Sequence, residues 1–305
     1  MSARILALLA LADEAPEAEE LAEYLADPEP DVRRTALTVL SEATEDWAHG
    51  SAQVAAAVLD PDPSVRATAV ELLAELREVL VAGEEFTAAL SQATAHTDPV
   101  VRAAAVGALW RHHRIAAEEA ERHLADPDPG VRAEAVHGLV SLGVLCATPL
   151  DAAAGDPAPE VRIAVAGGLG TIGDPRGASA LTELATDPDT AVAAAAFTAL
   201  AETGCPPHAA ALAAQALQQR DWQVREAAAK ALAAAPPELG AAPLTAATRD
   251  PNLDVRKAAV RSLGHLAPDD PEVPAALRTA TEDPDADVRA FARQALRRYP
   301  KPSER

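Results

Sequence analysis

The sequence predicts an all-α solenoid of about nine helical hairpins, in which each hairpin buries its apolar face only against its neighbours. One observation is a short segment that recurs along the chain every 30 to 36 residues. A period in this range is typical of repeat proteins. The segment centres on a Val-Arg pair at Val32-Arg33, Val65-Arg66, Val101-Arg102, Val131-Arg132, Val161-Arg162, Val224-Arg225, Val255-Arg256 and Val288-Arg289, and on the degenerate copy Val192-Ala193.

The second observation is the helical spacing of the apolar residues that follow each valine. The residue eight positions on is leucine in all nine copies, and the residue four positions on is alanine in all but the fifth, which has Val165. Positions 0, +4 and +8 share one face of an α-helix. The segment is therefore predicted to be the second helix of a pair, with a narrow buried seam that lets a neighbouring helix approach closely.

The start of this helix is marked by a capping residue three positions before the valine. Short polar side chains there accept hydrogen bonds from the free N–H groups of the first turn; they are Asp62, Asp98, Asp128, Asp189, Asp221, Asn252 and Asp285. Proline suits the first helical position because its missing N–H costs nothing there. It follows the capping position in the first five copies, as Pro30, Pro63, Pro99, Pro129 and Pro159.

An Asp-Pro pair before the cap ends the first helix of the pair, because a residue that precedes proline is pushed out of the α region. The pairs begin at Asp27, Asp60, Asp126, Asp156, Asp187, Asp250 and Asp283. Gly143, Gly173 and Gly204 lie twelve residues after their valines, where a left-handed C-terminal cap is expected.

The two ends of the array are predicted to be capping elements. Residues 1–14 contain the apolar run Ile5 to Ala12 after Arg4, which has features of a short signal peptide. We favour an N-terminal capping helix, because one basic residue is a weak n-region and the first repeat needs a cover. Residues 288–305 are predicted to form a C-terminal capping helix and a basic tail. The continuous period predicts a single solenoid domain over residues 1–305.

The repeated unit Asp-Pro-x-Pro-x-Val-Arg-x-x-Ala-x-x-x-Leu resembles the HEAT repeat, in its short bacterial form named after phycobilisome lyases, over about residues 15 to 299. The resemblance implies that the second helices line the concave face. It also implies that the turn aspartates and the repeat arginines form a structural ladder between repeats. The ladder is expected to be weakest where Ala193 replaces an arginine and where Gln219-Arg220 replaces Asp-Pro.

Composition limits the partners. The formal net charge is −21, from 26 Lys and Arg against 47 Asp and Glu, which disfavours nucleic acid and anionic membranes. The expected partner is therefore a protein, extended or basic. Two isolated thiols, Cys146 and Cys205, indicate a reducing compartment, so we expect a cytoplasmic protein. We also expect the protein to be monomeric by itself.

The most unusual segment is Trp110-Arg111-His112-His113-Arg114, at the end of the third copy. Trp and Arg are the residue types that most often anchor a partner, and both are expected near the inner surface. In the alternative interpretation, Trp110 packs under the next repeat and the basic residues complement the helix dipole. The sequence does not decide between the two.

The second helices are also expected to expose the residues six and ten positions after each valine. These positions are acidic in the first copies, small and neutral in the middle, and basic in the last copies, which suits an extended, charged partner. The alternative is that the charges only confer solubility, and that the glycines only allow close helix packing. The predicted partner-binding residues are Trp110, Arg111, His137, Gly167, Gly170, Lys230 and Arg261.

No catalytic, metal or cofactor site is predicted. Adjacent histidines such as His112 and His113 point about 100° apart on a helix, and no HxxxH or CxxC spacing occurs. The favoured function is a non-catalytic protein–protein interaction scaffold or regulator that binds on the concave face. The alternatives are an acidic inhibitor or immunity-type protein for a basic protein such as a nuclease, and a phycobilisome-lyase-like enzyme, which the resemblance implies.

Overall fold

The computed structural model describes residues 3–12, 14, 16–43, 47–143, 148–266 and 270–299. Within these residues the chain forms nineteen α-helices and two short 3-10 helices, and no strand, so the all-α prediction is confirmed. The second helices of the nine pairs are α3 (Pro30–Ala43), α5 (Pro63–Glu75), α7 (Pro99–Arg111), α9 (Pro129–Ser141), α11 (Pro159–Ile172), α13 (Thr190–Thr203), α15 (Trp222–Ala231), α17 (Leu253–Leu266) and α19 (Ala286–Leu296).

The first helices of the pairs are shorter on average and precede the Asp-Pro turns. They are α2 (Ala22–Leu25), α4 (Trp47–Ala57), α6 (Glu84–Ala93), α8 (Ala117–His123), α10 (Thr148–Ala154), α12 (Ala178–Leu184), α14 (Pro207–Ala216), α16 (Pro237–Ala247) and α18 (Glu272–Ala280). The 3-10 helices η1 (Pro175–Gly177) and η2 (Leu232–Ala234) join two of the pairs, and α1 (Ala3–Ala12) precedes them all.

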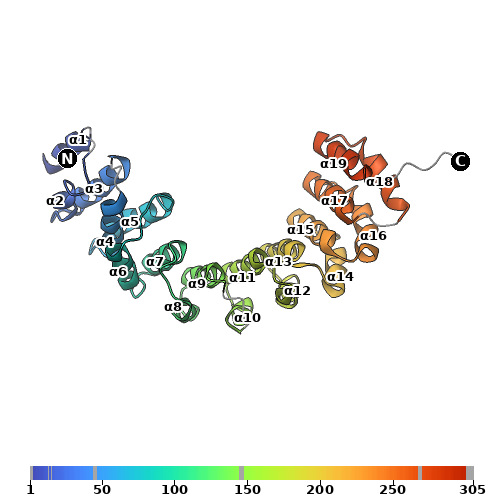
Figure 1. Ribbon diagram of the computed structural model, residues 1–305, viewed down its shortest axis with the longest axis horizontal. Helices are drawn as coiled ribbons and strands as arrows, with labels where there is room; N and C mark the ends of the chain where they lie inside the picture. Colours follow the sequence, from blue (N-terminus) through green and yellow to red (C-terminus); the bar gives the residue numbers. More distant parts are fainter. Residues whose placement is uncertain are drawn as a thin grey trace. The chain divides into compact units, whose positions relative to one another are not determined.

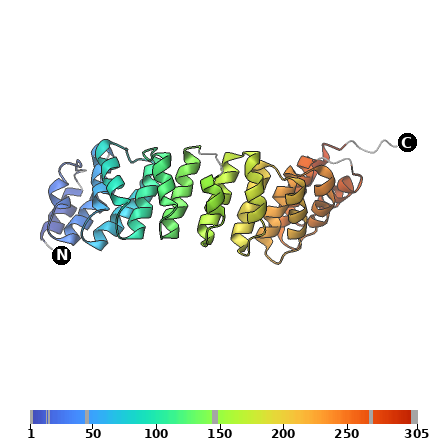
Figure 2. The same cartoon turned by 90° about the horizontal axis from the view of Figure 1, so that it is seen from below.

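The chain divides into two compact units, Met1–Val144 and Leu145–Arg305, which are built in the same way. In each unit a second helix packs along the second helix of the next repeat, as α7 does on α9 and α13 does on α15. The first helices form the other layer of each unit (Figure 1). Within a unit the helices lie side by side with nearly parallel axes (Figure 2), which is the solenoid arrangement.

The predicted apolar seam is buried. All nine repeat valines and the nine residues four positions after them are at most 2% exposed. Seven of the nine leucines are buried as well, whereas Leu169 and Leu296 are half-buried. Leu169 lies beside Gly177, which has no side chain to cover it, and Leu296 ends α19, the last described helix.

The predicted N-caps are confirmed at all seven positions. Each Asp or Asn side chain accepts a hydrogen bond from a backbone N–H two residues on, as Asp128 does from Gly130 at 2.9 Å. The five prolines are the first residues of their helices, as predicted.

The C-terminal glycines adopt positive φ angles, as expected. Gly143 and Gly173 have φ of 66° and 67°, and Gly173 is a left-handed cap. Gly204 combines φ of 99° with ψ of 145°, so it is not a left-handed helical cap. His113 takes the equivalent position of the third copy with φ of 55°.

Helix α1 packs on α3, buries Leu8 completely, and pairs Arg4 Nε with the carboxylate of Asp27. The first helix of repeat one is α-helical only over Ala22–Leu25. The residues before it form tighter turns, with Glu20 N–H bonded to the carbonyl oxygen of Glu17.

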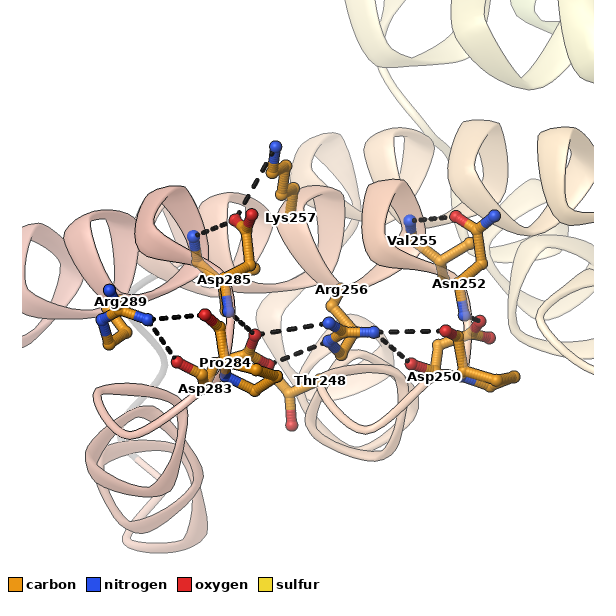
Figure 3. Close-up of polar contacts among 12 residues, drawn as sticks. Thr248, Asp250, Asn252, Val255, Arg256, Lys257, Asp283, Pro284, Asp285 and Arg289 are labelled. Atoms are coloured by element: carbon orange, nitrogen blue, oxygen red, sulfur yellow. Dashed lines mark hydrogen bonds and ion pairs between the residues drawn. The ribbon is translucent and has the colours of Figure 1, made fainter.

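Arginine–aspartate pairs connect successive repeats, as the family resemblance implied. Each arginine donates from Nε and Nη2 to both carboxylate oxygens of the next turn, at 2.7–3.3 Å, in Arg33–Asp60, Arg102–Asp126, Arg162–Asp187, Arg225–Asp250 and Arg256–Asp283. Its Nη1 donates to the carbonyl oxygens of its own turn. Figure 3 shows Arg256 between the Asp250 carbonyl and the Asp283 carboxylate. These bidentate bonds hold adjacent turns at a fixed spacing.

The ladder is interrupted where the sequence departs from the repeat. Ala193 has no guanidinium and cannot form an arginine–aspartate pair, as predicted. A second interruption was not predicted: the turn after Arg66 carries His96 in place of an aspartate. His96 Nδ1 accepts from Asp98 N–H at 3.0 Å and so holds the turn as an aspartate does. Nε of Arg66 is nevertheless buried without a hydrogen-bond partner in the described part of the chain.

Candidate functional site

The inner face is defined here as the positions six and ten residues after each repeat valine. All nine residues at the tenth position are exposed, and seven of the nine at the sixth are exposed. The exceptions are Lys230, which is half-buried, and Gly107, which lies under the side chains of Arg111 and Glu134. The second helices therefore expose the sixth and tenth positions, as the sequence predicted, with the two exceptions named.

In the first unit, Trp110, Arg111, Glu134 and His137 form a group that we call the Trp110 cluster. The half-buried indole of Trp110 packs against the core of the unit and lies over Gly138, where an added Cβ would be 3.3 Å from the Trp110 Cβ. Its Nε1 donates to Glu134 Oε2 at 2.6 Å. The ring of His137 lies 5.9 Å from the indole, between centroids. Trp110 therefore packs between α7 and α9, as the alternative interpretation proposed.

Arg111 covers the outside of the cluster. Its guanidinium carbon lies 4.6 Å from the centre of the Trp110 ring, and Nη2 lies 3.3 Å from Glu134 Oε1. Beside it a hollow of about 390 Å³ extends between α5 and α7, lined by Val70, Val100 and Ala104 among others. The cluster thus combines a packed indole with an accessible cation.

Of the two histidines in this segment, His112 has a packing role. His112 meets Phe86 edge-on at 5.3 Å between centroids. Burial, followed by the positive charge of Arg111, lowers the pKa of His112 below its ordinary value, so the ring is neutral at pH 7. Within the described residues, no three His, Cys, Asp or Glu side chains are placed to hold a metal ion together.

The two predicted glycines of the second unit differ in their surroundings. A Cβ added at Gly167 would meet nothing within 4 Å, and the residue is exposed. A Cβ at Gly170 would lie 3.0 Å from the Cα of Ala199, so close packing of α11 on α13 explains this glycine. The assignment of either residue to a partner surface stays a prediction.

The second unit contains a hollow of about 670 Å³ on the inner face, over α13, α15, α17 and α19, which we call the C-terminal groove. Lys230 and Arg261, both singled out from the sequence, line it together. Lys257 and Phe291 also line it but escaped the sequence analysis, because they follow their valines by two and three positions. Positions two and three lie on the same side of the helix as position six, and this shared face was the signal that could have identified them.

Most charges in the C-terminal groove are paired. Lys230 Nζ lies 2.6 Å from Glu226 Oε1, and Lys257 Nζ lies 2.8 Å from Asp287 Oδ2. Arg261 is different: its guanidinium carbon lies 5.2 Å from the centre of the Phe291 ring, and no carboxylate of the described residues pairs with it. The groove can therefore offer a fixed cation to a bound molecule.

Stacked helical hairpins with an exposed, charged second-helix face define an α-solenoid repeat protein. The family of HEAT repeats matches residues 18–110, 146–233 and 209–297, and the chain belongs to this family. A comparison with curated proteins finds no match.

Solved structures share the fold at low sequence identity. An engineered protein has a TM-score of 0.55 at 20% identity, over 91% of this chain and 87% of its own. A structure that concerns Kap95p binding to RanGDP has a TM-score of 0.59 at 15% identity, and importin beta has 0.58 at 14%. These two matches cover 96% and 91% of this chain but only 48% and 44% of theirs. None of the helices in the described ranges is long and apolar enough to cross a bilayer.

Proposed function

We propose that this protein is a non-catalytic scaffold that binds a protein partner in the C-terminal groove. The observation that carries the proposal is a hollow of about 670 Å³ that runs over four second helices and is lined by charged side chains. A long, shallow surface of this kind suits an extended polypeptide better than a small substrate. The similarity to a structure in which Kap95p binds RanGDP supports a protein partner.

The charges of the groove suggest the polarity of the bound segment. Glu202 on α13 has no cationic partner in the described part of the chain, whereas Arg261 on α17 has no anionic one. We infer a segment that carries basic residues over α13 and an acidic residue over α17 and α19. Such complementarity sets register and specificity more than affinity.

The proposed setting is the reducing cytoplasm, with the protein monomeric by itself. Burial raises the pKa of the Cys205 thiol to about 11, so this cysteine stays protonated and unreactive.

Site-specific cross-linking tests the proposal. A photo-crosslinking residue at Thr198, in the groove, is expected to capture one protein in cells, whereas the same residue at Arg278, exposed on first helix α18, is not. The captured protein, once purified, should bind the Lys230→Glu, Arg261→Glu double variant at least about tenfold more weakly than wild type, or about 1.4 kcal/mol. Equal capture from both sites, or unchanged affinity, would contradict the proposal.

A further inference from the structure

We propose that a small hollow at the end of the C-terminal groove binds a carboxylate of the partner polypeptide, held by Arg261 and Arg298. The hollow measures about 240 Å³ and is lined by Arg261, Gly264, His265, Phe291, Gln294 and Arg298. It shares Arg261, His265 and Phe291 with the groove, so the inference rests on the proposed function and specifies the ligand chemistry at one end of that site.

The lining of this hollow is cationic. Among the described residues, two arginines and one histidine contribute to it and no acidic residue does. Arg298 Nη1 donates to the carbonyl oxygen of Gly264 at 2.7 Å, which anchors the side chain without neutralising its charge. Elsewhere in the second unit, Arg162, Arg225 and Arg256 each pair with an aspartate. Arg261 and Arg298 have no such pair among the described residues, although the chain carries 47 acidic side chains.

Three acids beside the C-terminal groove pair with lysines and not with the arginines of the hollow. Lys257 Nζ lies 2.8 Å from Asp287 and 3.7 Å from Asp285, and Lys230 pairs with Glu226. Figure 3 shows Lys257 reaching to Asp285 on the neighbouring turn. No carboxylate of the described residues pairs with Arg261 or Arg298, so the positive charge of the hollow is open to a bound anion.

The geometry favours a planar carboxylate. Phe291 lies under the guanidinium of Arg261, which orders the side chain and leaves its N–H groups free to donate. A guanidinium binds a carboxylate through two parallel hydrogen bonds. The volume admits one side chain, and Phe291 offers an apolar surface to its neighbour. Net charge −21 disfavours the phosphate backbone of a nucleic acid as the source of the anion.

Nuclear magnetic resonance of the arginine Nε–Hε groups in the full-length protein tests this inference. The first probe is an acetylated, amidated heptapeptide with one central glutamate between phenylalanines. The second carries glutamine at the centre, and the third carries this glutamine and a free C-terminal carboxylate. The glutamate peptide is expected to shift the Arg261 and Arg298 signals and to bind at least about tenfold more tightly than the glutamine peptide.

The third peptide separates the two sources of a carboxylate. If it binds as tightly as the glutamate peptide, the hollow accepts a chain terminus as well as a side chain; if it binds like the second, only a side chain is accepted. Equal affinity of the glutamate and glutamine peptides, or no shift up to about 5 mM peptide, would overturn the inference.

A matched pair of variants assigns the effect to the hollow. Arg261→Gln should abolish the preference for glutamate, whereas Arg293→Gln removes the same charge from an exposed position of α19 outside the hollow and should leave it intact. Circular-dichroism melts show whether both variants fold. Equal losses in the two variants would mean unspecific attraction and would also overturn the inference. If the partner still cross-links to Thr198 and binds the Arg261→Gln variant as tightly as wild type, the carboxylate site is contradicted. The proposed scaffold function is not contradicted by that result.

Discussion

Nε1 of Trp110 donates a hydrogen bond to Oε2 of Glu134 on the following second helix, over 2.6 Å. The bond is charge-assisted and half-buried, and Arg111 lies over both groups. Because the indole also fills the space above Gly138, it holds α7 against α9 by packing and by polar contact together.

Truncation of this indole is expected to cost stability. Trp110→Ala should lower the free energy of unfolding by about 3 kcal/mol, as a large side chain is lost from the helix interface. Arg111→Ala is the control and should cost at most about 1 kcal/mol, because its ion pair is partly solvated. Urea unfolding measures both. If Trp110→Ala instead kept wild-type stability and weakened a bound partner by about 2 kcal/mol, the tryptophan would be a binding hot spot.

Gly167 and Gly170 of α11 should respond oppositely to alanine. Gly170→Ala places a Cβ 3.0 Å from the Cα of Ala199 and is expected to destabilise by about 1–3 kcal/mol as overpacking. Gly167→Ala meets open space and should stabilise by up to about 1 kcal/mol through helix propensity. Thermal and urea melts of the pair check this. Similar effects at both positions would show that α11 and α13 do not approach as closely as described.

Repair of the ladder at Arg66 should stabilise the first unit. His96→Asp supplies the missing carboxylate while it keeps an acceptor for the N–H of Asp98, and should add about 1–2 kcal/mol, since a hydrogen bond to a charged group is gained. His96→Asn keeps the turn acceptor without the charge and is the control. A gain in the His96→Asp variant that persists after Arg66→Met would rule out the restored rung as its cause.

The arginine–aspartate pairs between repeats are expected to make the free energy of unfolding sensitive to acid. The hydrogen bonds from Arg162 lower the pKa of Asp187 below its ordinary 3.8, despite burial. A lowered native pKa contributes stability that is present above the unfolded-state value and is lost as pH falls through the native one. Unfolding free energy should therefore decline from about pH 4 downward.

An Asp187→Asn variant isolates this rung. It should be less stable than wild type at neutral pH, and the difference between the two should shrink as the pH falls below about 4. A constant difference across that range would mean that Asp187 does not titrate with folding.

The repeat architecture was predictable because each copy carries its own local cues. A capping Asp or Asn, a proline at the first helical position, or both, mark the start of each second helix. The valine and the apolar residues four and eight positions after it mark the buried face, so neither feature depends on the neighbouring repeats. The interruption at His96 was visible as a departure from the Asp-Pro pattern, but its consequence lies on Arg66, thirty residues earlier.

The contacts between helices were less predictable. Gly167 and Gly170 look alike in sequence, and only the rotation of α11 against α13 separates the open position from the packed one. Glu134 was not singled out, because its role depends on how far Trp110 reaches across to α9. The convergence of Arg261, Phe291 and Arg298 likewise depends on the close approach of α17 and α19 at Gly264.

The interruptions of the ladder at Arg66 and at Ala193 have a consequence for how the array comes apart. In a linear stack the stability is a sum of the stability of each hairpin and the coupling between neighbours. A junction that lacks the arginine–aspartate pair has a smaller coupling free energy between its two hairpins. Fluctuations that detach one hairpin from the next are therefore expected to concentrate there. Each unit should therefore separate first at one junction, the first unit between α5 and α7 and the second between α13 and α15. Amide hydrogens on the two sides of such a junction should exchange with solvent in separate cooperative blocks.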